Sequence, residues 1–206
     1  MSGDDSLPLC LFGAGGHGRV VGSQAGKAFG NRLCFADDVI PVGEEFEGIP
    51  IKFSGLKDIV GHSLIITIGN NEIRQKRQQE AIDLGRLLTN FIANPQNYYA
   101  SAPGKGSVIL QGAIVNVGAL IGDGAILNSG AVVEHDCAVG SFAHLSPGSV
   151  MAGGSQIGDC SWLGTNACII PGKFVTNNVV IGAGAVVTRD ITESGTYAGI
   201  PARRIG

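Results

Sequence analysis

The chain has little charge, few aromatic residues and no long apolar segment. Charged residues make up 15% of its 206 positions, aromatic residues make up 6%, and the net charge is -3. Without a basic excess, the chain lacks the electrostatic footprint of a nucleic-acid-binding protein. No apolar run approaches the roughly 18 residues of a membrane span, and no basic start followed by an apolar run marks a secretory signal. We therefore expect no nucleic-acid partner and no membrane insertion.

Cysteine is present in a number and spacing that do not suit a disulfide scaffold. The five cysteines are odd in number and show no close metal-ligand spacing. Such residues are typical of buried thiols in a reducing compartment, so we expect a cytoplasmic protein.

Glycine, by contrast, is abundant, with 33 residues, and it accompanies a six-residue repeat. Every sixth residue from Ile109 to Val187 is apolar, and each of the first ten is followed four residues later by Ala, Ser or Cys. A helix requires an apolar spacing of about 3.6 residues and does not fit this pattern. A period of six suits a short strand and a turn, and three such units close a triangular coil. The repeat predicts a parallel β-helix of a little over four coils. Its apolar positions are Ile109, Val115, Ile121, Leu127, Val133, Val139, Leu145, Met151, Ile157, Leu163, Ile169, Val175, Ile181 and Val187.

The first hundred residues have a different texture, in which short apolar runs alternate with helical stretches. Strands are predicted at residues 9–12, 33–36, 64–68 and 87–93, and helices at 19–29 and 71–84. This alternation is typical of a small parallel α/β sheet. Asn94-Pro95 marks the boundary, so we expect domains at residues 1–94 and 95–206.

A glycine-rich loop follows the first predicted strand. Gly13, Gly15 and Gly18 satisfy G-x-G-x-x-G between a strand and a helix, and Asp37-Asp38 follow about 20 residues later. Glycines at these positions let the backbone approach a diphosphate at a helix N-terminus. Only one mononucleotide-binding half fits before the boundary, so a sugar linked to a nucleoside diphosphate fits better than a dinucleotide. A tight turn without any ligand is the alternative.

Two further polar features lie close to this loop in the predicted fold. His17 lies within the loop, where it either reaches a phosphate or sugar hydroxyl or is an exposed or capping histidine. The run Asn70-Asn71-Glu72-Ile73-Arg74 follows the third strand, at the edge where parallel sheets bind ligands. It either binds a ligand or caps the next helix.

Glu134-His135-Asp136 interrupts the apolar and small residues of the repeat. His135 follows the inward Val133 by two places, so it projects outward at a corner, and Gly153 one coil away leaves room beside it. A histidine oriented by a carboxylate suits general-base catalysis. We assign His135 as the base and Asp136 as its partner, with Glu134 as the competing partner.

Two other polar residues of the repeat have alternative interpretations. Asn128, one hexapeptide earlier, either hydrogen-bonds a substrate or a developing charge or is an ordinary stacked asparagine of the coil. His144, with Trp162 one coil above it, either contacts an acyl carrier or has a structural role. A zinc enzyme of this fold would need three histidines, and the repeat offers only His135 and His144, so no metal is expected.

Over nearly its whole length the chain resembles the bacterial UDP-amino-sugar N-acetyltransferases of the bacillosamine pathway. The residues that carry the resemblance are the loop from Gly13 to Gly18, Asp37-Asp38, residues 68–74, the hexapeptides with residues 134–137, and the ending Ala198-Gly199-Ile200-Pro201-Ala202. The resemblance implies a Rossmann-like half-domain followed by a left-handed parallel β-helix. It also implies acetyl-CoA as co-substrate and a homotrimer with active sites between subunits. The implied reaction converts UDP-2-acetamido-4-amino-2,4,6-trideoxyglucose to UDP-N,N'-diacetylbacillosamine.

Matching positions carry the family's site onto this chain. His135 would be the base, aided by Asp136, although the family often has the longer Glu at that place. The nucleotide-sugar site would be lined by Gly15, Gly16, His17, Asp37, Asp38 and Gly69. Acetyl-CoA would lie along His144, Gly153, Thr165, Gly182 and Ala183. Two rival functions remain: an O-acetyltransferase acting on sialic acid or a related sugar, and a non-catalytic nucleotide-sugar sensor that uses the β-helix as a trimerisation scaffold.

Overall fold

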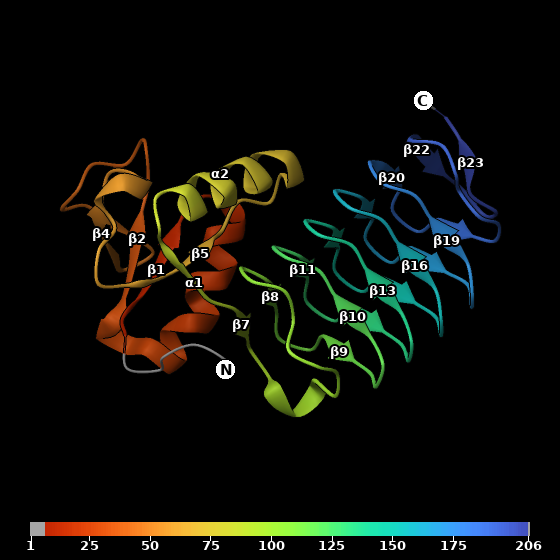
Figure 1. Ribbon diagram of the computed structural model, residues 1–206, viewed down its shortest axis with the longest axis horizontal. Helices are drawn as coiled ribbons and strands as arrows, with labels where there is room; N and C mark the ends of the chain where they lie inside the picture. Colours follow the sequence, from red (N-terminus) through yellow and green to blue (C-terminus); the bar gives the residue numbers. More distant parts are fainter. Residues whose placement is uncertain (1–6, 206) are drawn as a thin grey trace. The chain divides into compact units, whose positions relative to one another are not determined.

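The computed structural model describes residues 7–205, and the chain forms two compact units that divide between Ala93 and Asn94. The first unit is a sheet with two α-helices packed against it (Figure 1). Its strands are β1 (Leu9–Phe12), β2 (Leu33–Ala36), β3 (Glu45–Phe46), β4 (Ile49–Phe53), β5 (Ser63–Ile66), β6 (Leu87–Leu88) and β7 (Phe91–Ile92). Its helices are α1 (Gly16–Phe29) and α2 (Asn71–Asp83), with short 3-10 turns at Gly30–Arg32 and Leu56–Asp58.

The sheet of the first unit has the order β3-β4-β2-β1-β5-β6. β1 lies in the middle and pairs in parallel with β2 and β5, so the loops after these strands meet at one edge. All residues of these three strands are buried, which explains their apolar sequence. The α/β prediction is confirmed. Two details were wrong: the segment 87–93 splits into two short strands, and the hairpin of β3 and β4 was not predicted, because residues 39–62 lack a clear apolar period.

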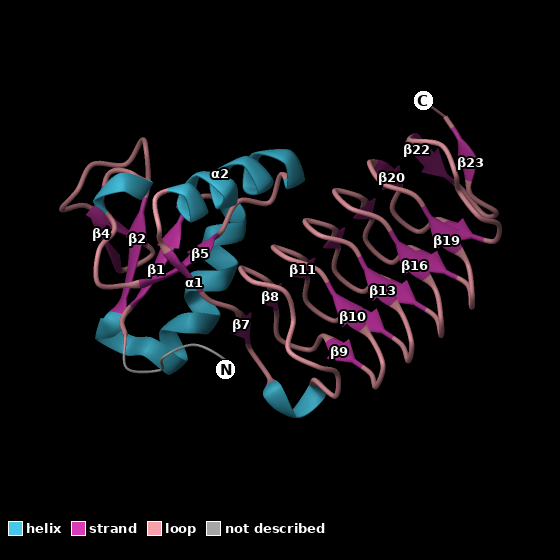
Figure 2. Ribbon diagram, viewed as in Figure 1, coloured by secondary structure: helices cyan, strands magenta, loops and turns pink. Residues whose placement is uncertain are grey.

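Both α-helices of the described residues belong to the first unit (Figure 2). α1 begins three residues earlier than predicted, inside the glycine loop. α2 has the predicted bounds to within one residue, and the side chain of Asn70 caps it by accepting a hydrogen bond from the Ile73 N–H at 3.0 Å. Neither helix reaches the length and apolar character of a membrane-spanning segment, and no other described helix does.

The second unit is a parallel β-helix, drawn as stacked strands in Figure 1. Strands one coil apart pair in register at an offset of eighteen residues, as Leu127 pairs with Leu145. Three faces result. The first contains β8 (Val108–Ile109), β11 (Ile126–Leu127), β14 (His144–Leu145), β17 (Trp162–Leu163) and β20 (Val179–Ile181); the second contains β9 (Ile114–Val115), β12 (Val132–Val133), β15 (Val150–Met151), β18 (Cys168–Ile169) and β21 (Val186–Val187); the third contains β10 (Leu120–Ile121), β13 (Ala138–Val139), β16 (Gln156–Ile157) and β19 (Phe174–Val175). A 3-10 turn (Pro95–Asn97) precedes the coils, and β22 (Gly195–Ala198) and β23 (Arg203–Arg204) follow them.

The interior of the coils consists of the apolar residues that the repeat predicts. All fourteen hexapeptide positions are buried, and none is more than 8% exposed. The small residues four places later are buried as well, for example Ala131 and Cys137. Burial of each Val, Leu or Ile contributes about 1.5–3 kcal/mol, so the continuous column is the main source of stability of this unit. The β-helix prediction is confirmed.

The outer surface of the second face is also apolar. Its outward residues form a column of half-buried side chains, which we call the apolar face: Ile114, Val132, Val150, Cys168 and Val186. The cysteine prediction holds only in part. Cys10, Cys34 and Cys137 are buried, whereas Cys160 and Cys168 are half-buried, because outward positions of the coil leave part of a side chain accessible.

Candidate active site

The glycine loop of the first unit has the conformation that its motif predicts. Gly13 has a φ of +109°, in the region that favours glycine. A side chain at Gly18 would collide with the carbonyl oxygen of Gly13, so this glycine permits α1 to pack closely on the strand. Gly15 and Gly16, in contrast, face open space. The backbone at the start of α1 is therefore accessible to a ligand, in the place where a helix N-terminus attracts anions.

The loop borders a cleft of about 480 Å³ at the carboxyl edge of the sheet. All six residues expected at the nucleotide-sugar site lie around it: Gly15, Gly16, His17, Asp37, Asp38 and Gly69. Gly69 and His17 are close together, since a β-carbon on Gly69 would lie 3.8 Å from that of His17. A larger hollow between residues 54–57 and α2 shares Asp38 and Arg77 with the cleft. It does not reach the glycine loop, so the smaller cleft is the candidate site.

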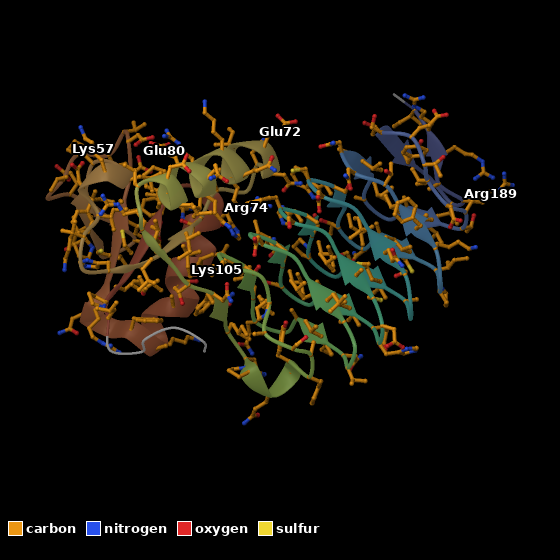
Figure 3. All side chains as sticks on the ribbon, in the orientation of Figure 1. Lys57, Glu72, Arg74, Glu80, Lys105 and Arg189 are labelled. Atoms are coloured by element: carbon orange, nitrogen blue, oxygen red, sulfur yellow. The ribbon has the colours of Figure 1, made fainter. Side chains whose placement is uncertain are left out.

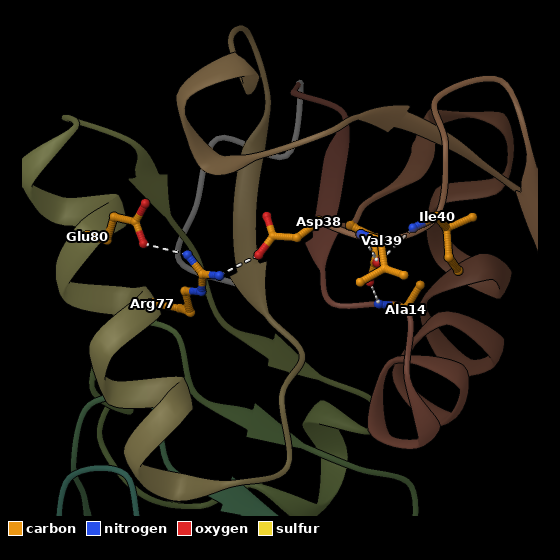
Figure 4. A network of polar contacts seen from close by, with 7 residues as sticks. Ala14, Asp38, Val39, Ile40, Arg77 and Glu80 are labelled. Atoms are coloured by element: carbon orange, nitrogen blue, oxygen red, sulfur yellow. Dashed lines mark hydrogen bonds and ion pairs between the residues drawn. The ribbon is translucent and has the colours of Figure 1, made fainter.

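Asp37 links the end of β2 to the glycine loop by hydrogen bonds to Ala14, Val39 and Ile40, which are labelled in Figure 4. Its Oδ2 accepts a hydrogen bond from the Ala14 N–H at 2.8 Å, and its Oδ1 accepts from the N–H groups of Val39 and Ile40 at 2.9 and 3.1 Å. Partial burial opposes ionisation of this carboxyl, but the three backbone donors outweigh it and lower the pKa of Asp37. Asp37 thus has a structural role at the cleft, whether or not it also contacts a ribose.

Asp38 faces an arginine that the sequence analysis did not identify. Arg77 forms ion pairs with Asp38 and, at 2.8 Å, with Glu80, and its guanidinium lies over the Phe12 ring at 5.5 Å (Figure 4). Arg77 lines the cleft. The helical period could have revealed it, because position 77 shares one side of α2 with Asn70 and Arg74.

The polar run after the third strand has a structural role. Arg74 is fully buried, and its guanidinium donates to the carbonyl oxygens of Ile68 and Gly69 at 2.9 and 3.1 Å and to Oδ1 of Asn71 at 2.9 Å. Figure 3 shows Arg74 and the exposed Glu72 on opposite sides of α2. Of the two interpretations of this run, the helix-capping one is confirmed for Asn70.

In the second unit, His135 and Asp136 form an exposed pair in the turn after β12. Nδ1 of His135 lies 2.9 Å from Oδ2 of Asp136, and the two side chains are 60% and 73% exposed. The hydrogen bond to Asp136 raises the pKa of His135, slight desolvation lowers it, and the charges of Asp136 and Glu134 raise it further. With its proton on Nδ1, the imidazole presents Nε2 as a free base.

Gly153 has a different relation to His135 from the one expected. A β-carbon at Gly153 would lie 2.5 Å from Nε2 and 2.8 Å from Cε1 of the ring. The space beside Gly153 that was expected to admit a substrate is therefore filled by the imidazole itself. Asp136, not Glu134, makes the hydrogen bond to the ring.

Asn128 and His144 form a second polar group, one that does not include His135. The Asn128 amide lies 3.1 Å from Nε2 of His144, and the His144 ring stacks on Trp162 with 5.1 Å between centroids. The indole N–H of Trp162 donates to the hydroxyl of Ser146 at 2.5 Å. His144 is only 7% exposed, so its ring is largely covered by its neighbours in the coils.

The candidate residues of the β-helix lie along two different edges. Asn128, Thr165, Gly182 and Ala183 are in turns between the first and second faces, which we call the Asn128 edge. Gly153 and the His135–Asp136 pair are in turns between the second and third faces, which we call the His135 edge. The apolar face separates the two edges by a six-residue side, up to about 20 Å long. Within one chain, therefore, Asn128 and His135 lie on different edges, with a strand of the apolar face between them.

No group of three or more His, Cys, Asp or Glu side chains suited to a metal ion occurs within residues 7–205.

Comparisons with known proteins match both units. Residues 8–81 match the PglD N-terminal domain. The acetyltransferase domain of PglB from Neisseria gonorrhoeae FA1090 is 34% identical with a TM-score of 0.88 over 96% of this chain and 98% of that chain, and it has also been solved in complex with acetyl coenzyme A. PerB from Caulobacter crescentus, solved with CoA and GDP-perosamine, is 35% identical with a TM-score of 0.86 over 96% and 97% of the two chains. GDP-perosamine N-acetyltransferase of Escherichia coli O157:H7 is 29% identical over 190 residues, 84% of this chain and 82% of that protein.

An α/β unit with a glycine loop, followed by a parallel β-helix of hexapeptides with an exposed histidine, defines the hexapeptide-repeat acyltransferase class. The chain belongs to the acetyl-CoA-dependent sugar N-acetyltransferases of the PglD and PerB type. The family resemblance noted in the sequence and the expected co-substrate, acetyl-CoA, are thereby confirmed. The alternative of a non-catalytic sensor is excluded by the same assignment.

Proposed function

We propose that the chain transfers an acetyl group from acetyl-CoA to the 4-amino group of UDP-2-acetamido-4-amino-2,4,6-trideoxyglucose, giving UDP-N,N'-diacetylbacillosamine. The observation that carries the proposal is the exposed His135–Asp136 pair in a chain whose first unit has a cleft at a glycine loop. The match of residues 8–81 to the PglD N-terminal domain supports the same class of acceptor. The odd number of cysteines, all of them free, fits a cytoplasmic enzyme.

In this reaction His135 is the general base. The sugar amine attacks the thioester carbonyl carbon and forms a C–N bond, and Nε2 of His135 accepts the proton that the nitrogen loses. The tetrahedral intermediate then expels CoA as a thiolate, which takes up a proton. Asp136 holds the proton on Nδ1 and stabilises the imidazolium that forms. Glu134 adds negative charge nearby without a hydrogen bond to the ring.

The cleft of the first unit is proposed to bind the nucleotide sugar. Gly15 and Gly16 present backbone N–H groups at the start of α1 to the diphosphate, and His17 and Gly69 line the adjoining wall. Asp38 is the better carboxylate for a ribose or base contact, because the oxygens of Asp37 already accept three backbone hydrogen bonds.

Acetyl-CoA is proposed to lie between subunits of a homotrimer. Thr165 and Ala183 are exposed turn residues one coil apart on the Asn128 edge, with Gly182 beside them and Asn128 and His144 below. Three copies with their apolar faces turned to a common axis would bring the Asn128 edge of each chain to the His135 edge of the next. Both groups of residues, including Gly153, would then border one site, which agrees with their separation within a single chain.

A GDP-linked 4-amino sugar is the second candidate acceptor. PerB, 35% identical to this chain, has been solved with GDP-perosamine. The two candidate acceptors share the diphosphate and the amine and differ in the nucleobase and the sugar. The glycine loop and His135 would therefore serve either acceptor.

A thiol-release assay with acetyl-CoA tests the acceptor. The UDP-4-amino sugar, GDP-perosamine and sialic acid are offered separately. CoA release with the UDP sugar alone supports the proposal, release with GDP-perosamine moves the assignment to the second candidate, and release only with sialic acid indicates the O-acetyltransferase. His135→Ala should keep the helix signal in circular dichroism and lose most of the rate, and near-normal turnover would remove His135 as the base.

The trimer is tested by a charge on the apolar face. Val150→Arg should give a monomer in light scattering, with intact circular dichroism and little acetyl transfer. Gln156→Arg, on the third face, is the matched control and should remain a trimer. A trimeric or fully active Val150→Arg protein would contradict this arrangement.

A further inference from the structure

The carboxylate of Asp136 lies against a glycine of the preceding coil. Gly118 is eighteen residues before Asp136, and the Asp136 N–H donates to the Val117 carbonyl at 3.2 Å. A β-carbon at Gly118 would overlap Oδ1 of Asp136 and lie 3.4 Å from its Cγ. The space that any side chain at position 118 would need is thus occupied by the Asp136 carboxylate.

Asp136 has a left-handed backbone at a turn position where the neighbouring coils have glycine. Its φ is +58°, whereas the corresponding turn residues of the neighbouring coils are Gly118, Gly154 and Gly172, with φ values of +76°, +67° and +67°. A left-handed conformation is unfavourable for a non-glycine residue, although aspartate tolerates it better than most. Phe142, Cys160, Asn166 and Asn178 have a similar φ in other turns of the β-helix, but at this turn position Asp136 replaces the glycine of the neighbouring coils and directly follows His135.

Glycines of two neighbouring coils border the pair. Gly118 lies beside the Asp136 carboxylate, and Gly153 lies beside the imidazole of His135. The turns at residues 116–119 and 152–155 contain no titratable side chain, and Glu134 is the other carboxylate in the turn of His135. The position of the Asp136 carboxylate is therefore the main local determinant of how strongly the imidazole holds a proton.

We propose that Gly118 is a positioning residue for the reaction: by lacking a side chain, it leaves the space in which the Asp136 carboxylate lies against Nδ1 of His135. Its kinetic consequence rests on the proposed function, in which His135 is the base. A methyl group at position 118 displaces the end of the Asp136 side chain and leaves the coil in place, because a carboxylate moves more easily than backbone. The imidazole then loses its partner.

Gly118→Ala tests this inference, with two matched controls. Gly172→Ala introduces the same side chain at the same turn position, with a similar φ and no atom within 4 Å. Gly148→Ala, at a φ of +68°, introduces a similar contact with Oδ1 of Asn166. Asn166 has no histidine beside it in the sequence, so this variant crowds a turn without affecting His135. The controls separate the effect on Asp136 from backbone strain and from crowding of a turn.

The readout is the pKa of His135 from NMR titration of labelled histidine rings. The chain has four histidines, and the His135 signal is identified by its loss in His135→Ala. Gly118→Ala should lower this pKa towards the ordinary histidine value and reduce kcat roughly tenfold, a part of the 10²–10⁴-fold typical of general-base catalysis. The two controls should leave the pKa unchanged. An unchanged pKa in Gly118→Ala overturns the inference. A lowered pKa with an unchanged rate supports the placement of the Asp136 carboxylate by Gly118 and contradicts the kinetic consequence, which rests on the proposed function.

A double-mutant cycle provides the second test. In an Asp136→Gly background, where the turn has the residue that its neighbours have, Gly118→Ala should leave the His135 pKa unaltered. The same decrease in both backgrounds would overturn the inference. If Gly118→Ala does not fold, Gly118→Asn takes its place, because the chain holds Asn166 and Asn178 at φ values of +55° and +56°.

Discussion

Replacement of Asp37 by Asn tests how the glycine loop is held. The carboxylate receives three backbone N–H groups, one from Ala14 in the loop and two from Val39 and Ile40. An asparagine has one acceptor oxygen. If that oxygen keeps the contacts to Val39 and Ile40, the side-chain amide faces the Ala14 N–H, so one donor opposes another. The loop then loses its attachment to the end of β2.

The expected loss follows from these contacts. Ala14 is only 8% exposed, and leaving such an N–H without an acceptor costs about 1–3 kcal/mol. The two remaining hydrogen bonds weaken because their acceptor becomes neutral. We expect the free energy of unfolding of the first unit to fall by about 2–3 kcal/mol. Because the pKa of Asp37 is lowered in the folded state, its contribution is present above the ordinary value of 3.8 and is lost as pH falls through the lowered pKa.

Two signals assign the effect to one unit. Circular dichroism of the helices reports the first unit, which contains α1 and α2, and fluorescence of the single Trp162 reports the β-helix. Asp38→Asn is the control, because its ion pair with Arg77 is partly exposed and contributes about 0–1 kcal/mol. Asp37→Asn should also raise the KM for the nucleotide sugar with little change in kcat. A loss no greater than that of Asp38→Asn, or a shift of the Trp162 transition alone, would refute the reasoning.

Three further changes have defined outcomes. Thr67→Val removes a hydroxyl that donates to the carbonyl oxygens of Phe12 and Gly13 at 3.0 and 2.9 Å. The free energy of unfolding of the first unit, followed by circular dichroism of the helices, should fall by about 1 kcal/mol. An unchanged free energy would show that these hydrogen bonds do not stabilise the unit. Leu145→Ala leaves a cavity in the core of the coils. The free energy of unfolding of the β-helix, followed by Trp162 fluorescence, should fall by about 2–5 kcal/mol. A smaller decrease would show that the coils collapse around the cavity. Asp136→Gly should lower the pKa of His135, so the acid limb of the kcat profile, where the base becomes protonated, should move to lower pH. An unmoved limb would show that Asp136 does not set this pKa.

The β-helix could be predicted almost completely, because its sequence period and its structural period are the same. A residue eighteen places away is a neighbour in the next coil, so the burial of Val133 and Leu145 and the stacking of Trp162 on His144 follow from counting. The cleft proposed for the nucleotide sugar was predictable for a similar reason, since parallel strands place their following loops at one edge. Arg77 was missed because it enters the cleft from the side of a helix and not from a strand end.

Local backbone geometry decides which carboxylate is the partner of His135, the proposed base. Glu134 and Asp136 flank His135 symmetrically in sequence, so no counting argument separates them. The left-handed φ of Asp136 makes the difference, because it brings this carboxylate to Nδ1 and into the space beside Gly118. The separation of Asn128 from His135 follows from the sequence period, because residues seven apart in this repeat fall in different turns of one coil.

The exposure of the proposed base explains why two edges of one β-helix carry candidate residues. The His135 side chain is 60% exposed in a single chain, whereas stabilisation of a developing charge is strongest where donors are fixed and water is excluded. Of the residues expected along acetyl-CoA, Gly153 lies beside the imidazole, whereas Thr165, Gly182 and Ala183 lie across the apolar face on the Asn128 edge. A neighbouring copy that covers the apolar face would shield the base and supply the acetyl-CoA contacts in the same step. In the proposed trimer each chain would contribute two half-sites, and the coil register that keeps them apart within a chain would allow them to meet between chains.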